Sequence, residues 1–162
     1  MVFVTYHYFL GLKTMTILDE SVIDINRIYG KNMTIDDIPI NDPKTYEKIA
    51  QGYTSGIFQL ESSGMTAFMK KLFQDVSEKI LEINKLPLSD MGKKQKYEEL
   101  GNILYERLIA GISLYRPGPM NEIPNYIEGM LNPDKIHYYT PELEEILSKT
   151  YGVIVYQGAT RS

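Results

Sequence analysis

A proline–glycine–proline turn limits the possible folds of this chain more than any other feature of its sequence. The segment YRPGPM, residues 115–120, places this turn directly after an arginine. Proline fixes φ at about −65° and lacks a backbone N–H, whereas glycine can adopt positive φ. The turn therefore cannot continue a helix or join the middle of a sheet. We interpret it as a rigid, exposed turn that holds the positive charge of Arg116 in one place.

The length and composition are those of one soluble globular domain. The chain has 162 residues, of which 43% are hydrophobic, and this is enough for one core but short for two. It has no cysteine, which excludes disulfides and thiolate chemistry and fits a cytoplasmic location. We expect no signal peptide in residues 1–12 and no membrane span, because no run approaches ~18 apolar residues.

The net charge of −4 argues against a nucleic-acid footprint over the whole surface, because phosphate binding normally needs a basic face. Any basic face must therefore be local. Lysines cluster at residues 70–71 and 93–96, and acidic residues cluster at 98–99 and 142–145. We interpret these runs as the solvated faces of helices.

Apolar spacing, caps and stop signals predict a mainly α-helical fold with one or two short strands. Residues 153–156 are the best strand candidate, and residues 57–60 form either a brief strand or a buried turn. Met65 and Met69 fall on the inner face of their helix, so we expect them in the core. The lysine- and glutamate-rich segment 74–102 is expected to be a surface excursion. Helices are expected over residues 16–30, 42–52, 62–72, 76–86, 97–112, 123–130 and 140–152.

Residues suited to catalysis are few. His7 and His137 lie far from any serine or carboxylate pattern that would make a triad, and the sequence contains no metal-binding or phosphate-loop motif. We therefore assign both histidines structural roles. A hydrolase that uses Glu61 as its base would lack partner residues at a useful spacing.

The segment GYTSGIFQLESSGM, residues 52–65, combines glycines with hydroxyl side chains. If Ser62, Ser63 and Gly64 open a helix, their backbone amides lie at its positive end and can bind an anion. The alternative is a capping turn with ordinary serines. Arg116 has two interpretations as well, because its guanidinium can bind a phosphate or pair within the fold.

Four motifs occur in a fixed order along the chain: FLGLKT at 9–14, GIFQLESSGM at 56–65, LYRPGPM at 114–120 and YGVIVYQ at 151–157. Together with DDIPINDPKTYEK at 36–48, they resemble the C family of bacterial replicative DNA polymerases, the α subunits of DNA polymerase III. By this resemblance, the first motif looks like the end of the palm, and the other three look like the fingers.

The resemblance implies a domain organisation. Residues 1–14 look like a residual palm segment, and residues 15–157 look like a fragment of the fingers subdomain. Residues 74–102 look longer than the family's usual connection, which indicates an insertion, and residues 158–162 look like an unrelated tail. A complete subunit of this family is several times longer.

The resemblance also implies partners and contacts. In the parent enzyme, this region faces primer-template DNA and the incoming deoxynucleoside triphosphate, and it meets other polymerase domains or replisome subunits in the bacterial cytoplasm. The implied candidates for nucleotide or phosphate binding are Arg116, Lys13, Gln59, Ser62, Ser63 and Gly64.

One departure from the family affects catalysis. Tyr8 occupies the position of a metal-binding aspartate, and Tyr6 replaces a basic residue. The family uses Mg²⁺, but a phenol is a poor ligand for it at neutral pH, so we expect neither a metal site nor a catalytic residue in this chain. We expect a DNA polymerase fragment that is not catalytic alone. The alternative is a non-catalytic helical remnant or interaction module that binds no nucleotide.

Overall fold

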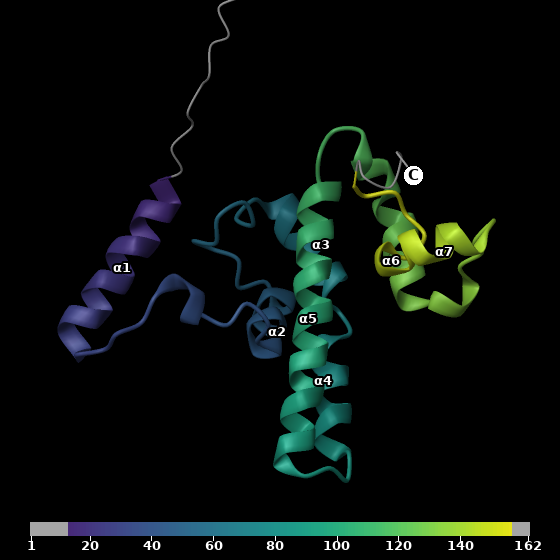
Figure 1. Ribbon diagram of the computed structural model, residues 1–162. Coiled ribbons are helices and arrows are strands. Elements are labelled where there is room, and N and C mark those ends of the chain that lie inside the picture. Colours follow the sequence, from purple (N-terminus) through teal and green to yellow (C-terminus); the bar gives the residue numbers. More distant parts are fainter. Residues whose placement is uncertain (1–12, 157–162) are drawn as a thin grey trace, which may run out of the picture. The chain divides into compact units, whose positions relative to one another are not determined.

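The computed structural model describes residues 13–156 (Figure 1). Each regular element in that range is a helix, so the prediction of a mainly α-helical fold is confirmed. The chain divides into two units, one that ends at Pro39 and one that begins at Ile40.

The first unit contains α1 (Lys13–Tyr29) and a 3₁₀ turn, η1 (Ile35–Asp37). The predicted helix 16–30 is confirmed, with an earlier start at Lys13. Gly30 ends the helix with a φ of 60°. The side-chain amide of Asn26 then donates to the carbonyl of Met33 at 2.8 Å and accepts its N–H at 2.9 Å, which folds the following segment back on α1.

The second unit is built around α5 (Asp90–Leu114), the longest helix in Figure 1. Helices α2 (Pro43–Gln51), α3 (Ser63–Leu72) and α4 (Val76–Lys85) pack against α5, and α2 also contacts α3 and α4. The chain then continues through η2 (Pro119–Glu122), α6 (Ile123–Leu131), η3 (Pro133–Lys135), α7 (Pro141–Leu147) and η4 (Ser148–Thr150).

Polar caps and a glycine set the helix ends near the predicted functional residues. Asp42 accepts the backbone N–H of Lys44 at 3.0 Å at the start of α2. Gly52 ends that helix with a φ of 95°, a left-handed conformation that suits glycine. Ser62 caps α3 by accepting the N–H of Met65 at 3.2 Å. The sequence predicts all three ends, and the structure confirms them.

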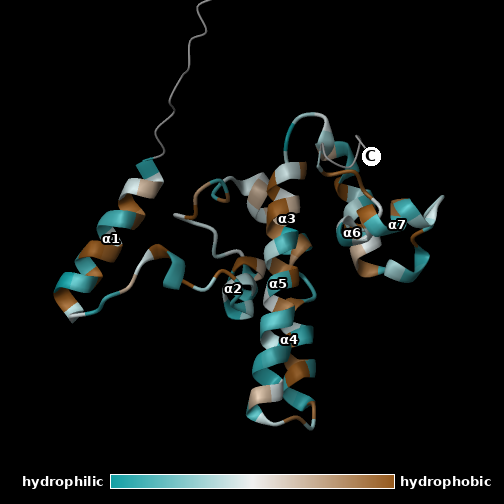
Figure 2. Ribbon diagram, in the orientation of Figure 1, coloured by the Kyte–Doolittle hydropathy of each residue, from teal (hydrophilic) through white to brown (hydrophobic). Residues whose placement is uncertain are grey.

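The core of the second unit lies among α2, α3, α4 and α5. Leu72, Phe73 and Leu104 are completely buried. Met65 and Met69 are also buried, which confirms that these methionines belong to the core. In Figure 2, bands of hydrophobic and hydrophilic residues alternate along α5, as expected for a helix with one face on the core.

Two close contacts hold residues 40–41, at the start of the second unit, against α5 and α2. Gly101 allows α5 to approach the chain before α2, because a Cβ at this position would collide with the backbone carbonyl of Asn41. The Tyr46 hydroxyl donates to the carbonyl of Ile40. Burial raises the pKa of Tyr46 to about 12, so this hydroxyl keeps its proton at neutral pH.

The prediction of a strand at residues 153–156 is wrong. Val153 is buried, and its carbonyl accepts the Thr150 hydroxyl at 2.6 Å. A strand needs a partner for its ladder, and residues 13–156 contain no other strand. Residues 57–60 form turns, with the N–H of Leu60 donating to the carbonyl of Ile57 at 3.0 Å.

The segment 74–102 is a helical hairpin instead of a surface excursion. It contains α4 and the first part of α5, which begins at Asp90 and not near residue 97. Val76, Ile80 and Ile83 of α4 lie in the core, because their helical spacing places them on one buried face. Whether the segment is an insertion stays a prediction.

A buried ion pair links α5 to two other segments. Arg107, 4% exposed, donates to Asp75 at 2.7 Å and to the Tyr151 hydroxyl at 3.1 Å. Tyr126 of α6 packs edge-on against Tyr151, with ring centroids 5.2 Å apart. Burial lowers the pKa of Arg107, but its bonds to Asp75 and Tyr151 outweigh burial and raise the pKa above the ordinary value. The charged pair therefore joins α5, the start of α4 and the segment after η4.

Arg107→Leu leaves the Asp75 carboxylate without its counter-charge. We expect the free energy of unfolding to fall by ~3–5 kcal/mol, because removing one partner of a buried ion pair leaves the other charge buried without compensation. Urea denaturation followed by circular dichroism measures this change. Lys96→Gln in the same helix breaks the exposed 2.6 Å contact with Glu99 and is the matched control, with a nearly unchanged midpoint. Equal midpoints for the two variants would contradict a structural role for Arg107.

Candidate functional site

The end of α5 and the start of α3 bring two distant sequence motifs to one pocket. Its volume is about 300 Å³. Three of the predicted residues, Gln59, Ser62 and Arg116, line it. The pocket is completed by Met65, Ile112 and Tyr115. The site thus has an apolar floor with polar and cationic groups at its edge.

Hydroxyl contacts hold the loop before α3 against the first turns of that helix. Thr66 Oγ1 lies 2.7 Å from Thr54 Oγ1, 3.0 Å from the Ser62 carbonyl and 3.3 Å from the Leu60 carbonyl. Thr54 is 2% exposed, so this contact is shielded from water. The loop is therefore fixed to the helix whose N-terminus borders the pocket.

Gln59 adopts an unusual backbone conformation within this loop. Its φ is 65°, and the only other described residue besides glycine with positive φ is Tyr151. A left-handed conformation costs a residue with a Cβ roughly 1–2 kcal/mol. The loop holds Gln59 in this conformation at the rim of the pocket, although glycine would fit the backbone better.

The first turn of α3 presents backbone donors beside the pocket. The N–H of Met65 binds the Ser62 hydroxyl, and the N–H of Thr66 binds the Ser62 carbonyl at 2.8 Å. The N–H groups of Ser63 and Gly64 belong to the first turn, where a helix has no carbonyl of its own for them. The positive end of α3 thus adjoins the Ser62 side of the pocket.

Tyr115 and Arg116 form the opposite wall. Tyr115 stacks on Phe68, with ring centroids 5.6 Å apart and an angle of 16° between the planes. A Cβ on Gly64 would collide with the Tyr115 hydroxyl, so this glycine lets the two motifs meet. The tight turn that follows uses Gly118, with a φ of 98°. The sequence predicted this turn, and its backbone confirms it.

Arg116 is exposed at the pocket edge. Among residues 13–156, its guanidinium forms neither a salt bridge nor a cation–π contact, and Tyr115 stacks on Phe68 instead. The described part of the chain therefore gives no support to the alternative in which Arg116 pairs within the fold. Lys13 is the first residue of α1 in the other unit, and its role stays a prediction.

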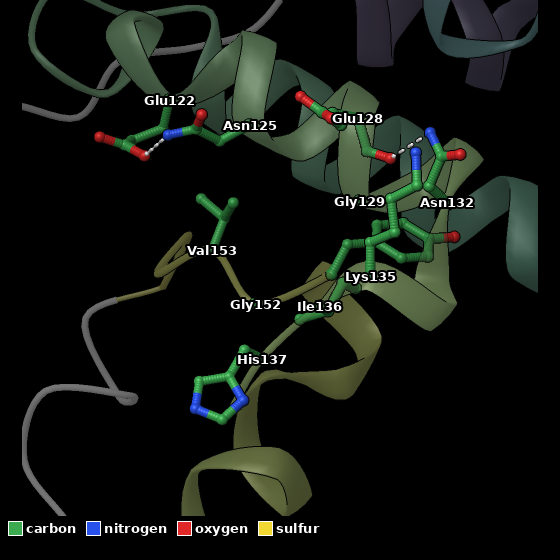
Figure 3. A pocket seen from close by; sticks show the side chains of 11 residues that line it. Glu122, Asn125, Glu128, Gly129, Asn132, Lys135, Ile136, His137, Gly152 and Val153 are labelled. Atoms are coloured by element: carbon green, nitrogen blue, oxygen red, sulfur yellow. Dashed lines mark hydrogen bonds between the residues drawn. The ribbon is translucent and has the colours of Figure 1, made fainter. Parts of the chain in front are cut away.

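A second pocket, of about 290 Å³, lies between α6 and the segments that follow it (Figure 3). Gly129 and Gly152 form part of its lining, and a Cβ on Gly129 would come within 2.8 Å of the Tyr151 carbonyl. Its polar groups include Glu122, which accepts from the Asn125 amide at 2.9 Å, and His137. Apart from its two glycines, no sequence pattern predicts this pocket.

The chain matches the family described as bacterial DNA polymerase III alpha subunit finger domain over residues 14–87 and 88–159. It belongs to this family. DNA polymerase III subunit alpha of Staphylococcus aureus strain Mu50 is 40% identical over 149 residues, which cover 92% of this chain and 11% of the relative. The protein of the same name from Halalkalibacterium halodurans is 38% identical over the same shares. This finger domain thus spans 11% of the length of these relatives.

The family confirms the resemblance inferred from the motifs. Of the four motifs, GIFQLESSGM and LYRPGPM build the pocket of the finger domain. Tyr6 and Tyr8, on which the prediction about catalysis depends, lie outside the described residues, as does most of the first motif. None of the helices in residues 13–156 is long and apolar enough to cross a membrane.

Gln59→Gly tests whether the positive φ at residue 59 destabilises the finger domain. We expect the variant to be at least as stable as the parent chain, because glycine adopts positive φ without steric cost. Gln59→Val should lower the urea midpoint, since a β-branched residue fits this conformation poorly. Thermal and urea denaturation of both variants measure the difference. A less stable glycine variant and an unaffected valine variant would show that the conformation is not strained.

Proposed function

We propose that this finger domain acts in DNA replication as part of a DNA-directed DNA polymerase and binds a phosphate group at the pocket beside α3. The observation that carries the proposal is the convergence of Gln59, Ser62 and Arg116, from two motifs far apart in the sequence, on one pocket. The phosphate belongs to the incoming deoxynucleoside triphosphate or to the template strand.

The chemistry of the pocket suits a phosphate. A guanidinium presents a planar fork of donors to phosphate oxygens, and Arg116 lies at the pocket directly before the turn at 117–119. On the opposite side, the Ser62 hydroxyl and the first-turn amides of α3 add neutral donors and the positive end of a helix. Tyr115, which is held by stacking on the buried Phe68, supplies an aromatic wall against which a base or sugar can pack.

Phosphoryl transfer itself is proposed to depend on other parts of the polymerase. Two-metal transfer needs carboxylates that hold Mg²⁺, and the family's aspartate position is Tyr8 in this chain. Within residues 13–156, no group of three or more histidine, aspartate or glutamate side chains is arranged to hold a metal ion. We therefore assign the described residues to nucleotide and template contacts.

Arg116→Ala tests the phosphate site directly. We expect the variant of the 162-residue chain to bind deoxynucleoside triphosphate at least tenfold more weakly, because hydrogen bonds to charged groups contribute ~1.5–3 kcal/mol. Arg116→Lys should recover only part of the affinity, since lysine lacks the planar fork. NMR titration that follows the amide signals of Ser63 and Gly64 measures binding and location together.

Lys94→Ala, an exposed substitution near the start of α5, is the matched control and should bind like the parent chain. Titration with a short single-stranded oligonucleotide in place of triphosphate distinguishes a template phosphate from the incoming nucleotide. If Arg116→Ala and Lys94→Ala bind both probes as the parent chain does, the remnant or interaction module replaces the proposed function.

The purified chain should not extend a primer in the presence of Mg²⁺ and all four deoxynucleoside triphosphates. The physical reason is that Tyr8 cannot replace the carboxylate that two-metal transfer requires. Denaturing gel electrophoresis of a labelled primer measures extension, with the DNA polymerase III subunit alpha of Staphylococcus aureus as positive control. Extension that is abolished by changing one residue of this chain would overturn the prediction.

A further inference from the structure

An exposed tyrosine and two lysines lie near the C-terminal part of α3, and the pocket lies at the start of the same helix. Tyr53 follows the end of α2 and is 66% exposed, although a tyrosine of this size usually buries much of its ring. Lys48 lies over the Tyr53 ring, and Lys70 lies beside Gly52, the residue before it. These three residues, Tyr53, Lys48 and Lys70, form the Tyr53 patch.

Direct contacts define the geometry of the Tyr53 patch. The Nζ atom of Lys48 lies 5.3 Å from the centroid of the Tyr53 ring. The N–H of Tyr53 donates to the Lys48 carbonyl at 3.1 Å, which fixes the ring beside the end of α2. Lys70 crosses over Gly52 from α3, and a Cβ on Gly52 would collide with its Cε atom and lie 3.0 Å from its Nζ atom. One ammonium group thus lies over the exposed ring, and a second lies beside the residue that precedes it.

The positive charge of the Tyr53 patch is not neutralised by neighbouring carboxylates. None of the salt bridges in the described part of the chain includes Lys48 or Lys70. Glu47 of α2 instead accepts the Ser77 hydroxyl at 2.8 Å, on the side of α4. In a chain with a net charge of −4, this is a local basic site.

One row of α3 connects the Tyr53 patch with the pocket. Ser62, Thr66 and Lys70 are spaced four residues apart, so they follow one another along the same face of the helix. Ser62 lines the pocket, and Lys70 belongs to the patch. Eight residues of helix correspond to roughly 12 Å, and stacked nucleotides advance by about 3.4 Å each. Three to four nucleotides would therefore span the two sites.

We propose that the Tyr53 patch binds single-stranded DNA, with a base stacked on the face of Tyr53 opposite Lys48 and a phosphate held by Lys48 and Lys70. The inference rests on the proposed function, because it places template nucleotides outside the pocket along α3. Stacking on an exposed aromatic ring beside basic side chains binds a strand without reading its sequence. A duplex cannot use the ring in this way, since its bases are already stacked and paired.

The test measures fluorescence anisotropy of the 162-residue chain with a fluorescein-labelled twelve-nucleotide oligothymidylate and with a twelve-base-pair duplex, over a range of salt concentrations. Tyr53→Leu removes the ring and should weaken single-strand binding ~5-fold or more. The double variant Lys48→Gln/Lys70→Gln should make the slope of log K against log salt shallower by ~0.7, because the two lysines hold one phosphate and each phosphate contact with a single strand contributes ~0.7. The duplex should respond little to Tyr53→Leu.

Matched controls come from the same unit. Tyr139→Leu removes a tyrosine that is 87% exposed, and Lys94→Gln removes an exposed lysine of α5, and neither should change binding. Urea midpoints within error of the parent chain verify that the exposed substitutions keep the fold. Equal effects of Tyr53→Leu and Tyr139→Leu, equal affinity for single strand and duplex, or no measurable binding of the oligonucleotide would each overturn the inference.

Arg116→Ala, measured both in the triphosphate titration and in this anisotropy assay, separates this inference from the proposed function. If Arg116→Ala leaves triphosphate binding unchanged while Tyr53→Leu weakens single-strand binding, the proposed phosphate pocket is contradicted and the Tyr53 patch is supported. If Arg116→Ala weakens triphosphate binding while the substitutions of Tyr53, Lys48 and Lys70 leave single-strand binding unchanged, the patch is contradicted and the pocket is supported. Competition by polyglutamate as strong as that by unlabelled oligonucleotide would show that the patch recognises acidic chains in general, and this also contradicts the inference.

Discussion

The buried contact of Arg107 with Asp75 and Tyr151 joins segments that the rest of the second unit needs in place. Arg107 belongs to α5, Asp75 precedes α4, and Tyr151 follows η4 with a positive φ of 53°. A charged group this deeply buried is tolerated only when its donors are bonded, so the three segments must come together as one unit. The edge-on packing of Tyr126 extends this connection to α6.

The position of the pocket follows from the anchoring of α5. This helix ends at Leu114, a completely buried residue, directly before Tyr115 and Arg116. The stacking of Tyr115 on Phe68 then sets the end of α5 against α3, and Gly64 leaves room for the tyrosine hydroxyl. The buried end of α5 on one side and the capped start of α3 on the other therefore hold the two walls of the pocket.

Positive φ at Gln59 and Tyr151 places backbone strain in two of the family motifs. Both residues carry side chains where glycine would suit the backbone, and both belong to sites that the structure ties down, Gln59 through the loop before α3 and Tyr151 through Arg107. Strain that persists in a fold is maintained by surrounding contacts. In this unit, the hydroxyl contacts of Thr66 and the charged contact of Arg107 supply them.

The sequence by itself determined the helical class, most helix ends and the motifs that identify the family, because caps, glycines and apolar spacing act over a few residues. It also named Gln59, Ser62 and Arg116 as candidates. Only the tertiary structure decided that these three share one pocket, that α4 belongs to the core, and that residues 153–156 form no strand, since a strand needs a partner that no local pattern supplies. The Tyr53 patch likewise depends on Lys70 of α3 crossing Gly52, a contact between helices that spacing along the chain does not encode.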